Sequence, residues 1–372
     1  MNATQERLHY MDHLRALAML AGVFFHAALA FSPLMQGFFP TADRQNSAWV
    51  DVVAWGLHLF RMPLFFVVAG FFAAWVIERR GGAAFARQRV RRIALPFLVA
   101  WPLVWLSLSA AVVWAVENVR HPSAFLAMVD AWMRMDDPPQ APLGTSHLWF
   151  LYYLLLLAVL QWVARTLDLG RALRGVLTRH PAWLLLGLPV LLVPALASVS
   201  APHPAPEGLL PQFWALLFYG AFYALGTQLH AAPGWLERVR PCVPWLVAGG
   251  AVLYALFLWR LSVELPGATQ PTASWPVAAL EALLSVWLTV LCLVAGQRLL
   301  NRASAPMRYL AQSAYWTYLW HLPLLFALQF ALMDSDMAWP LKFALASGAT
   351  LAVCLLSYQL LVRHTPLRRF VG

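Results

Sequence analysis

The sequence predicts an all-α integral membrane protein with about ten transmembrane helices, and three observations support this fold class. Of the 372 residues, 61% are hydrophobic and only 11% are charged, whereas soluble domains carry about 25% charged residues. About ten stretches are long and apolar enough to cross a hydrocarbon core of about 30 Å. The arginines gather in every second connection between these stretches. We therefore expect residues 1–372 to form a single transmembrane domain in a lipid bilayer.

The expected spans follow the chain in order, and the first one is a retained helix rather than a signal peptide. Its apolar stretch is flanked by Arg7 and Arg15 and is longer than the core of about 7–15 residues in a signal peptide. The fifth span is the weakest because Pro189 and Pro194 interrupt it, although neighbouring helices can satisfy the carbonyls that proline frees. The longest outer connection, at about residues 116–146, is expected to be a loop. The spans are expected near residues 14–34, 49–76, 88–115, 147–164, 182–199, 211–229, 242–261, 275–296, 310–332 and 339–361.

The positive charges lie almost entirely in alternate connections. Cytoplasmic loops of membrane proteins carry an excess of Lys and Arg, so this pattern predicts that both termini are cytoplasmic. Membrane topology thereby explains the formal net charge of +10, and no nucleic-acid partner is expected. The odd-numbered connections hold only Arg44, Arg120, Arg134 and Arg260. The even-numbered connections hold Arg79, Arg80, Arg87, Arg89, Arg91, Arg92, Arg165, Arg171, Arg174, Arg179, Arg238, Arg240, Arg298, Arg302 and Arg308.

The three cysteines, Cys242, Cys292 and Cys354, stand singly in apolar stretches. Their spacing matches neither a disulfide framework nor a set of metal ligands. We expect them to be small buried hydrophobic residues. We expect no metal ion and no permanently bound cofactor.

The first span carries Arg15 and His26, which are eleven positions apart. An α-helix turns about 100° and rises about 1.5 Å per residue, so the two side chains lie within roughly 20° of each other and about 16 Å apart along the axis. This spacing predicts a cation at the headgroup level and an imidazole near the membrane midplane, on one face of the helix. Ionisable groups at that depth are costly and mark functional sites.

Five further ionisable side chains lie inside the expected spans or at the end of one. The first two of them are three residues apart and share a helix face. One interpretation is that these groups line a polar substrate cavity with His26; the alternative is that each bonds to a neighbouring helix, as polar groups in membranes often do. The five side chains are His58, Arg61, His147, Glu281 and His321.

Two arginines where the second span leads into the third, Arg89 and Arg92, would meet Arg15 at one cytoplasmic entrance. Arginine binds phosphate bidentately, although arginines at a membrane surface can also serve only topology or anionic lipid. The phosphates of a coenzyme A thioester would suit this entrance, and its pantetheine arm is about as long as the rise from Arg15 to His26, about 16 Å. A neutral imidazole there can deprotonate a hydroxyl or accept the acyl group. The pattern therefore predicts acyl-CoA as a co-substrate.

Short motifs that support this chemistry are spread over the whole chain. They are Asp12-x2-Arg15-x10-His26, Phe60-Arg61-Met62-Pro63-Leu64-Phe65-Phe66, Arg89-x2-Arg92, Ser146-His147-Leu148-Trp149-Phe150-Leu151, Arg298-Leu299-Leu300-Asn301 and Tyr315-x2-Tyr318-Leu319-x-His321-x-Pro323. Together they resemble the membrane acyltransferase-3 family and, within it, the periplasmic glucan succinyltransferases.

The resemblance implies ten helices in the bacterial inner membrane, acyl-CoA on the cytoplasmic side and acylation of a glycan on the outer side. It also implies that Arg15, Arg89 and Arg92 bind the acyl donor and that His26 carries out the transfer. The acceptor would be a periplasmic glucan and the acyl group succinyl, with O-acetyl transfer to another envelope glycan as the alternative. One departure is Ala69, which stands where family members often have a serine.

Two other functions compete with acyl transfer. A glycan or lipid transporter would use the same midplane polar groups, but transporters tend to show paired halves with broken helices at equivalent positions, and the sequence has no such symmetry. A haem-carrying electron carrier would use facing histidines, but it would leave the arginine cluster unexplained. We therefore expect an enzyme.

Overall fold

The computed structural model describes residues 9–139, 143–167, 179–232, 234–264 and 272–371, and helices account for most of them. These ranges contain no β-strand apart from one isolated bridge between Gly144 and Gly208, so the all-α prediction is confirmed for them. Arg7, Arg171 and Arg174 lie outside the described residues. The longer helices are α1 (His9–Leu29), α2 (Ala48–Arg89), α3 (Leu95–Asn118), α4 (Ala124–Met133), α5 (Trp149–Thr166), α7 (Leu188–Leu196), α8 (Phe213–Ala231), α10 (Val243–Glu264), α11 (Trp275–Leu299), α12 (Ala305–Leu332) and α13 (Trp339–Ser357). The shorter helical elements are η1 (Pro33–Met35), η2 (Val90–Ala94), η3 (Ser146–Leu148), η4 (Trp183–Gly187), α9 (Trp235–Val239), η5 (Arg240–Cys242), η6 (Tyr358–Val362) and α14 (Arg368–Val371).

Each of the ten expected spans falls on a helix, and five helical stretches of the described residues are long and apolar enough to cross a membrane. The first helix is not among the five, because Asp12, Arg15 and His26 lower its mean hydropathy. The number of ten spans and the cytoplasmic position of the termini stay predictions. The five stretches are Ala48–Asn118, Ser146–Arg165, Trp235–Glu264, Trp275–Leu299 and Trp339–Val362.

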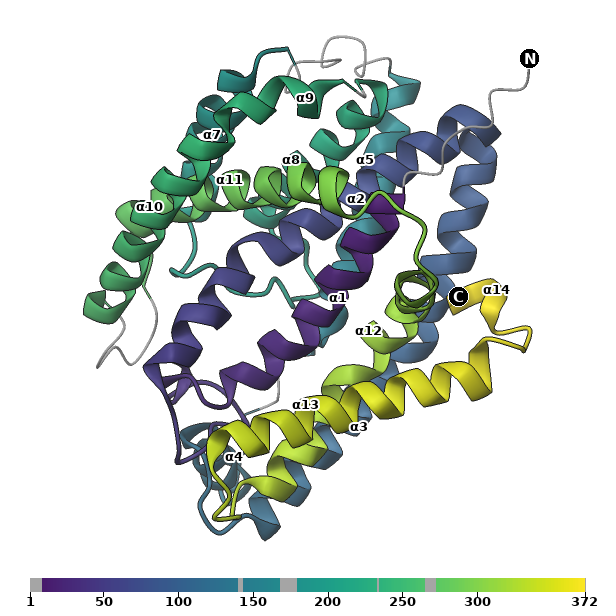
Figure 1. The fold of residues 1–372 in the computed structure, drawn as a ribbon. Coiled ribbons are helices and arrows are strands. Elements are labelled where there is room, and N and C mark those ends of the chain that lie inside the picture. The colour runs from purple at the N-terminus through teal and green to yellow at the C-terminus, as the bar shows by residue number, and fades with distance from the viewer. Residues whose placement is uncertain (1–8, 140–142, 168–178, 233, 265–271, 372) are drawn as a thin grey trace.

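The first of these stretches contains both α2 and α3 without an intervening loop. Its helical path is broken at Gly81, whose φ of 76° lies in the left-handed region that glycine adopts without steric cost. The chain reverses direction near this glycine, and the last part of α2 leads back through η2 into α3 (Figure 1). The reversal brings Arg89 and Arg92 back against the helical bundle.

The helices α2 and α8 approach each other to backbone contact, and two glycines permit this approach. A Cβ atom at Gly70 would lie 2.0 Å from the Tyr223 carbonyl oxygen, and one at Gly226 would lie 1.9 Å from the Val67 carbonyl oxygen. Small residues let membrane helices approach to backbone contact. The pair therefore fixes α2, which carries His58 and Arg61.

The first helix crosses the middle of the bundle between α2 and α12 (Figure 1). It ends at Leu29 rather than near residue 34, because Pro33 lacks an amide donor and disfavours helical geometry in the residue before it. His26 consequently lies in the last turn of α1 instead of near its middle, and the chain beyond Leu29 folds over that end.

The outer connection at residues 116–146 is not entirely a loop, since α4 lies within it. The Ser123 side chain accepts a hydrogen bond from the Leu126 amide at 3.2 Å and caps this helix. The Ser123 hydroxyl also donates to the Pro40 carbonyl at 2.7 Å. This contact joins the connection to the segment that covers the end of α1.

Candidate active site

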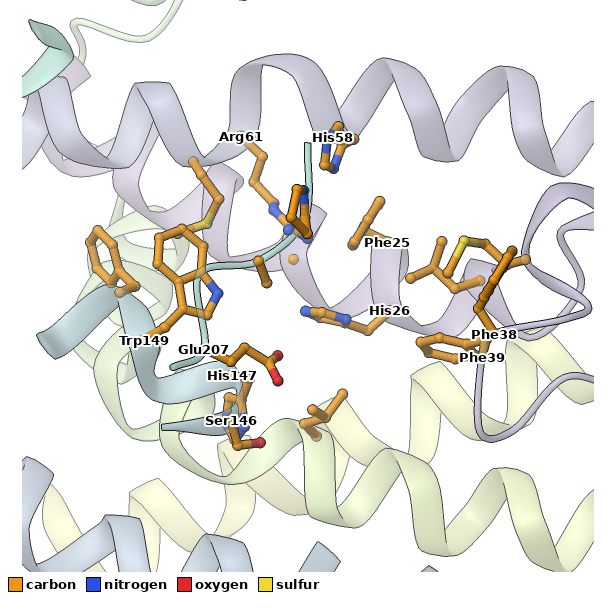
Figure 2. Close-up of a pocket in the computed structure, with 18 of the residues that line it drawn as sticks. Phe25, His26, Phe38, Phe39, His58, Arg61, Ser146, His147, Trp149 and Glu207 are labelled. Atoms are coloured by element: carbon orange, nitrogen blue, oxygen red, sulfur yellow. The ribbon is translucent and has the colours of Figure 1, made fainter. Parts of the chain in front are cut away.

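A cavity of about 620 Å³ opens beside the end of α1, and the predicted substrate-cavity residues meet there. We call it the histidine cavity. In Figure 2, His58 and Arg61 reach it from one side, Ser146, His147 and Glu207 reach it from the other, and the His26 ring lies between them. The predicted residues that line it are His26, His58, Arg61, His147 and His321.

The imidazole of His26 is partly exposed to this cavity and makes no hydrogen bond to any described residue. Its ring centroid lies 5.2 Å from that of Phe25 and 5.5 Å from that of His321. Its ring nitrogens are therefore available to a bound molecule.

One backbone carbonyl, that of Tyr318 on α12, holds two other histidines. The His321 Nδ1 atom lies 2.8 Å from this oxygen, and the His147 Nε2 atom lies 3.1 Å from it. Because a carbonyl only accepts hydrogen bonds, each of these nitrogens must carry its proton. The opposite nitrogens, His321 Nε2 and His147 Nδ1, have no hydrogen-bond partner among the residues that the structure describes, so neutral rings present lone pairs there.

The guanidinium of Arg61 is a buried cation that forms no ion pair with a carboxylate of the described residues. Arg61 is only 6% exposed, and its Nε and Nη1 atoms have no hydrogen-bond partner among the described residues. The guanidinium lies over the Phe25 ring, whose centroid is 4.1 Å from the guanidinium carbon. Buried cations are usually paired, so this arrangement suits an anionic ligand.

Behind the cavity wall, Glu281 joins two histidines. The His203 Nδ1 atom lies 2.9 Å from the Glu281 Oε1 atom, and the His58 Nε2 atom lies 3.8 Å from the same oxygen. His203 and His58 line the cavity, whereas Glu281 does not. Glu281 thus contacts a loop histidine that the sequence analysis did not single out.

The loop that follows α7 also brings Glu207 to the cavity (Figure 2). Its backbone carbonyl accepts hydrogen bonds from the amide and the hydroxyl of Thr145, at 2.6 and 2.9 Å. The Glu207 side chain is exposed at the cavity surface, yet desolvation by the surrounding protein raises the pKa of its carboxyl to about 7. Next to Thr145, Ser146 has a φ of 50°, a strained conformation typical of functional sites.

The chain between α1 and α2 lines one end of the cavity, and buried polar contacts hold it in place. The Lys342 ammonium, 1% exposed, donates to the Asp43 carboxylate at 2.7 Å. The Thr41 hydroxyl donates to the Gln329 side-chain oxygen at 2.8 Å. These contacts fix the cover to α12 and α13.

A second cavity, of about 340 Å³, contains the three predicted donor-binding arginines. We call it the arginine cavity. Arg15 donates to the Ala311 carbonyl at 3.0 Å and lies 3.4 Å from Asp12, whereas the Arg89 guanidinium lies over the Phe85 ring. The three arginines that line the cavity are Arg15, Arg89 and Arg92.

The two cavities share three lining residues, Phe65, Phe150 and Tyr318. The Phe65 and Phe150 ring centroids are 5.3 Å apart. A single layer of aromatic side chains therefore separates the arginine cavity from the histidine cavity.

Comparison with known proteins shows to which family the chain belongs. A profile described as an acyltransferase domain, of the acyltransferase-3 type, matches residues 8–359. The chain belongs to the acyltransferase-3 family. It is a multi-pass membrane enzyme that transfers acyl groups.

The chain is also similar to curated proteins that share one name. The acyltransferase is 24% identical over 332 residues to proteins named "Glucans biosynthesis protein C" from Salmonella paratyphi B, Salmonella dublin and Salmonella enteritidis PT4. Each match covers 86% of this chain and 82% of the relative. No solved structure matches the chain.

Sequence reasoning did not identify two residues of the acyltransferase's histidine cavity, His203 and Glu207. Both lie in a proline-rich loop without helical periodicity, so no pattern showed where their side chains point. One feature of the sequence could have pointed to them: two titratable side chains lie within five positions of each other in the short connection between the fifth and sixth expected spans.

Proposed function

We propose that this acyltransferase moves an acyl group, with succinyl favoured, from acyl-CoA in the arginine cavity to a hydroxyl of a periplasmic glucan in the histidine cavity. The observation that carries the proposal is the pair of cavities with a shared aromatic wall. One cavity offers arginines that suit phosphates, and the other offers imidazoles that suit proton transfer.

The donor would bind in the arginine cavity without entering the membrane completely. Guanidinium groups bind phosphate oxygens by parallel hydrogen bonds, and Arg92 is exposed to solvent while Arg89 is half-buried. Arg92 would thus meet the donor first, and Arg89 would hold a phosphate deeper in the cavity. The aromatic side chains of Trp75 and Phe370 also line this cavity and suit a purine ring.

His26 would assist the transfer itself. As a base, it takes the proton of the acceptor hydroxyl while the hydroxyl oxygen attacks the thioester carbon; the carbon–sulfur bond breaks and the coenzyme A thiol leaves with a proton. As an acyl acceptor, a ring nitrogen of His26 attacks the thioester carbon, the carbon–sulfur bond breaks and the coenzyme A thiol leaves with the ring proton. The acceptor hydroxyl then takes the acyl group from the acyl-imidazole, and its proton returns to the imidazole. Both routes need a neutral ring nitrogen that is open to the cavity, which the position of His26 supplies.

Arg61 supports the preference for succinyl. A succinyl group carries a free carboxylate beyond the reacting carbonyl, and Arg61 is a buried cation that lacks an acidic partner in the described residues. An acetyl group would leave that cation unpaired. The name of the curated relatives supports a glucan acceptor, and Glu207 offers a carboxylate to sugar hydroxyls.

The direct test is acyl transfer by purified protein in lipid nanodiscs, with succinyl-CoA as donor and a glucan as acceptor. His26→Ala should abolish transfer while coenzyme A binding is retained. His121→Ala is the matched control, because His121 is an exposed histidine that contacts Asp334 outside both cavities. Transfer by His26→Ala at the wild-type rate would refute the role of His26.

Envelope glycans of a strain lacking the gene should also lose their succinyl or acetyl esters, and unchanged glycans would refute the acceptor assignment.

A further inference from the structure

Three side chains beside the histidine cavity form a cluster that acyl transfer does not use. They are His58 on α2, His203 in the loop after α7 and Glu281 on α11. One ligand atom from each lies within 4.8 Å of the ligand atoms of the other two. Three separate parts of the chain therefore deliver two imidazoles and a carboxylate to one point.

We propose that His58, His203 and Glu281 bind a divalent transition-metal ion, with Zn²⁺ as the best match. Two imidazoles and one carboxylate form a common donor set for zinc sites that keep a further position open. In a tetrahedral site with bonds of about 2.0–2.2 Å, ligand atoms are about 3.3–3.5 Å apart. The observed separations from Glu281 Oε1, 2.9 Å to His203 and 3.8 Å to His58, lie on either side of that value.

An unpartnered nitrogen supports an ion here over a simple hydrogen-bonded cluster. The His58 Nε2 atom is buried and has no hydrogen-bond partner in the described part of the chain, because 3.8 Å from the carboxylate is too long for a hydrogen bond. A metal ion between the three groups would satisfy this nitrogen and the carboxylate together. It would also balance the charge of Glu281, which is 1% exposed.

The backbone holds the carboxylate in a fixed orientation. The His203 amide donates to both Glu281 oxygens, at 3.1 and 3.3 Å. Hydrogen bonds of this kind orient metal ligands and are characteristic of metal sites. The site is therefore supported by contacts beyond its three ligands.

The open position of the ion would face the histidine cavity, since His58 and His203 line that cavity. Arg61 lies three residues after His58, on the same face of α2. An ion would thus add a second positive charge beside the buried guanidinium and offer a site for an oxygen ligand. No metal was expected from the sequence, in which the cysteines have no metal-ligand spacing, whereas the three ligands of the proposed site are far apart in the chain.

Metal content of the purified full-length protein tests the proposal independently of activity. After removal of any affinity tag and treatment with a chelator, the protein is incubated with Zn²⁺, desalted and analysed by elemental mass spectrometry. We expect about one Zn²⁺ per chain, and with Co²⁺ we expect visible absorption bands of a low-symmetry site that Zn²⁺ abolishes. Wild-type protein that retains no Zn²⁺ above the buffer level would overturn the proposal, even if acyl transfer is intact.

The Zn²⁺ affinity of variants with a substituted ligand shows whether the ion binds at this cluster. His58→Gln and Glu281→Gln should each lower Zn²⁺ affinity at least about tenfold; His58→Gln removes a ligand whose Nε2 makes no hydrogen bond, so its folding should be preserved. The matched control is His230→Gln, which removes a histidine that lies 2.6 Å from Glu78 away from the cavity, and its Zn²⁺ binding should equal that of the wild type. Equal binding by all variants would show an adventitious ion elsewhere and overturn the proposal.

Discussion

Arg61 should destabilise the empty enzyme and select its donor, and Arg61→Met separates the two effects. Two buried donor atoms of Arg61 are unpaired, and each unsatisfied buried group costs about 1–3 kcal/mol. The cation–π contact with Phe25 stabilises the folded state by about 0.5–2 kcal/mol and offsets part of this cost. Methionine has a similar length and no polar hydrogen, so we expect Arg61→Met to raise the free energy of unfolding by about 2–3 kcal/mol.

The same substitution should impair use of succinyl-CoA. A hydrogen bond to a charged group contributes about 1.5–3 kcal/mol, and its loss lowers kcat/KM by about 10- to 150-fold. Acetyl-CoA has no distal carboxylate, so its kcat/KM should change much less. The expected outcome is an enzyme that is more stable but less selective.

Thermal unfolding followed by tryptophan fluorescence and transfer kinetics with both donors provide the measurements. Arg79→Met is the matched control, because Arg79 also lies on α2 over an aromatic ring, that of Trp75, but is exposed. It should change stability by less than about 0.5 kcal/mol. A lower melting temperature for Arg61→Met would refute the claim that the unpaired guanidinium destabilises the empty enzyme. Equal losses of kcat/KM with both donors would refute the claim that Arg61 binds the succinyl carboxylate.

Three further predictions concern the cavities and the helix packing. Because burial raises the pKa of Glu207 to about 7, acyl transfer should rise with pH through that value, and Glu207→Gln should flatten the profile. The folded state also holds this proton more tightly than the unfolded state, so Glu207 should make stability fall as pH rises from about 4.5 to about 7. Gly226→Ala should cost about 3 kcal/mol or more by thermal unfolding, since its methyl group would meet a backbone carbonyl, whereas Gly348→Ala has open space and should be neutral. Arg92→Gln should raise the KM for acyl-CoA and leave kcat nearly unchanged, whereas Arg87→Gln, which is outside the arginine cavity, should alter neither.

Each of these has a contradicting result. A pH profile that is the same with and without Glu207 would exclude its carboxylate from the rate. Equal melting temperatures for the two glycine variants would mean that α2 and α8 are not in backbone contact. A lower kcat with an unchanged KM in Arg92→Gln would place Arg92 at the transfer step instead of the donor site.

Much of the site could be predicted from the sequence, because a single ionisable residue in an apolar span is recognisable by its free-energy cost in the membrane. Helical periodicity then shows which of these residues share one face of a helix. His26 and Arg15 stand out in an apolar helix, and the structure places them on the histidine cavity and the arginine cavity respectively. Whether they have the predicted chemical roles stays open to the experiments above. Hydropathy alone also located a helix at each of the ten expected spans, although it missed α4 and placed the end of α1 about five residues too late.

The remaining features depend on contacts between segments that are distant in the chain. Nothing in the sequence near Arg61 shows that the guanidinium has no acidic partner, because a partner could come from any neighbouring helix. The pairing of His203 with Glu281 joins positions 78 residues apart. Only the packing of the loop after α7 against α11 brings them together.

The shared aromatic wall limits where an acyl group could pass between the cavities. The Tyr318 hydroxyl donates to the His147 carbonyl, and the Tyr318 carbonyl accepts from His147 and His321, so three hydrogen bonds fix this residue. Phe65 and Phe150 meet only through ring contacts, which are weak in comparison and adjust by side-chain rotation. An arm that reaches from Arg15 toward His26, about 16 Å along α1, is therefore expected to pass on the phenylalanine side. Tyr318 would then keep the two lone-pair histidines in place while the wall beside it opens.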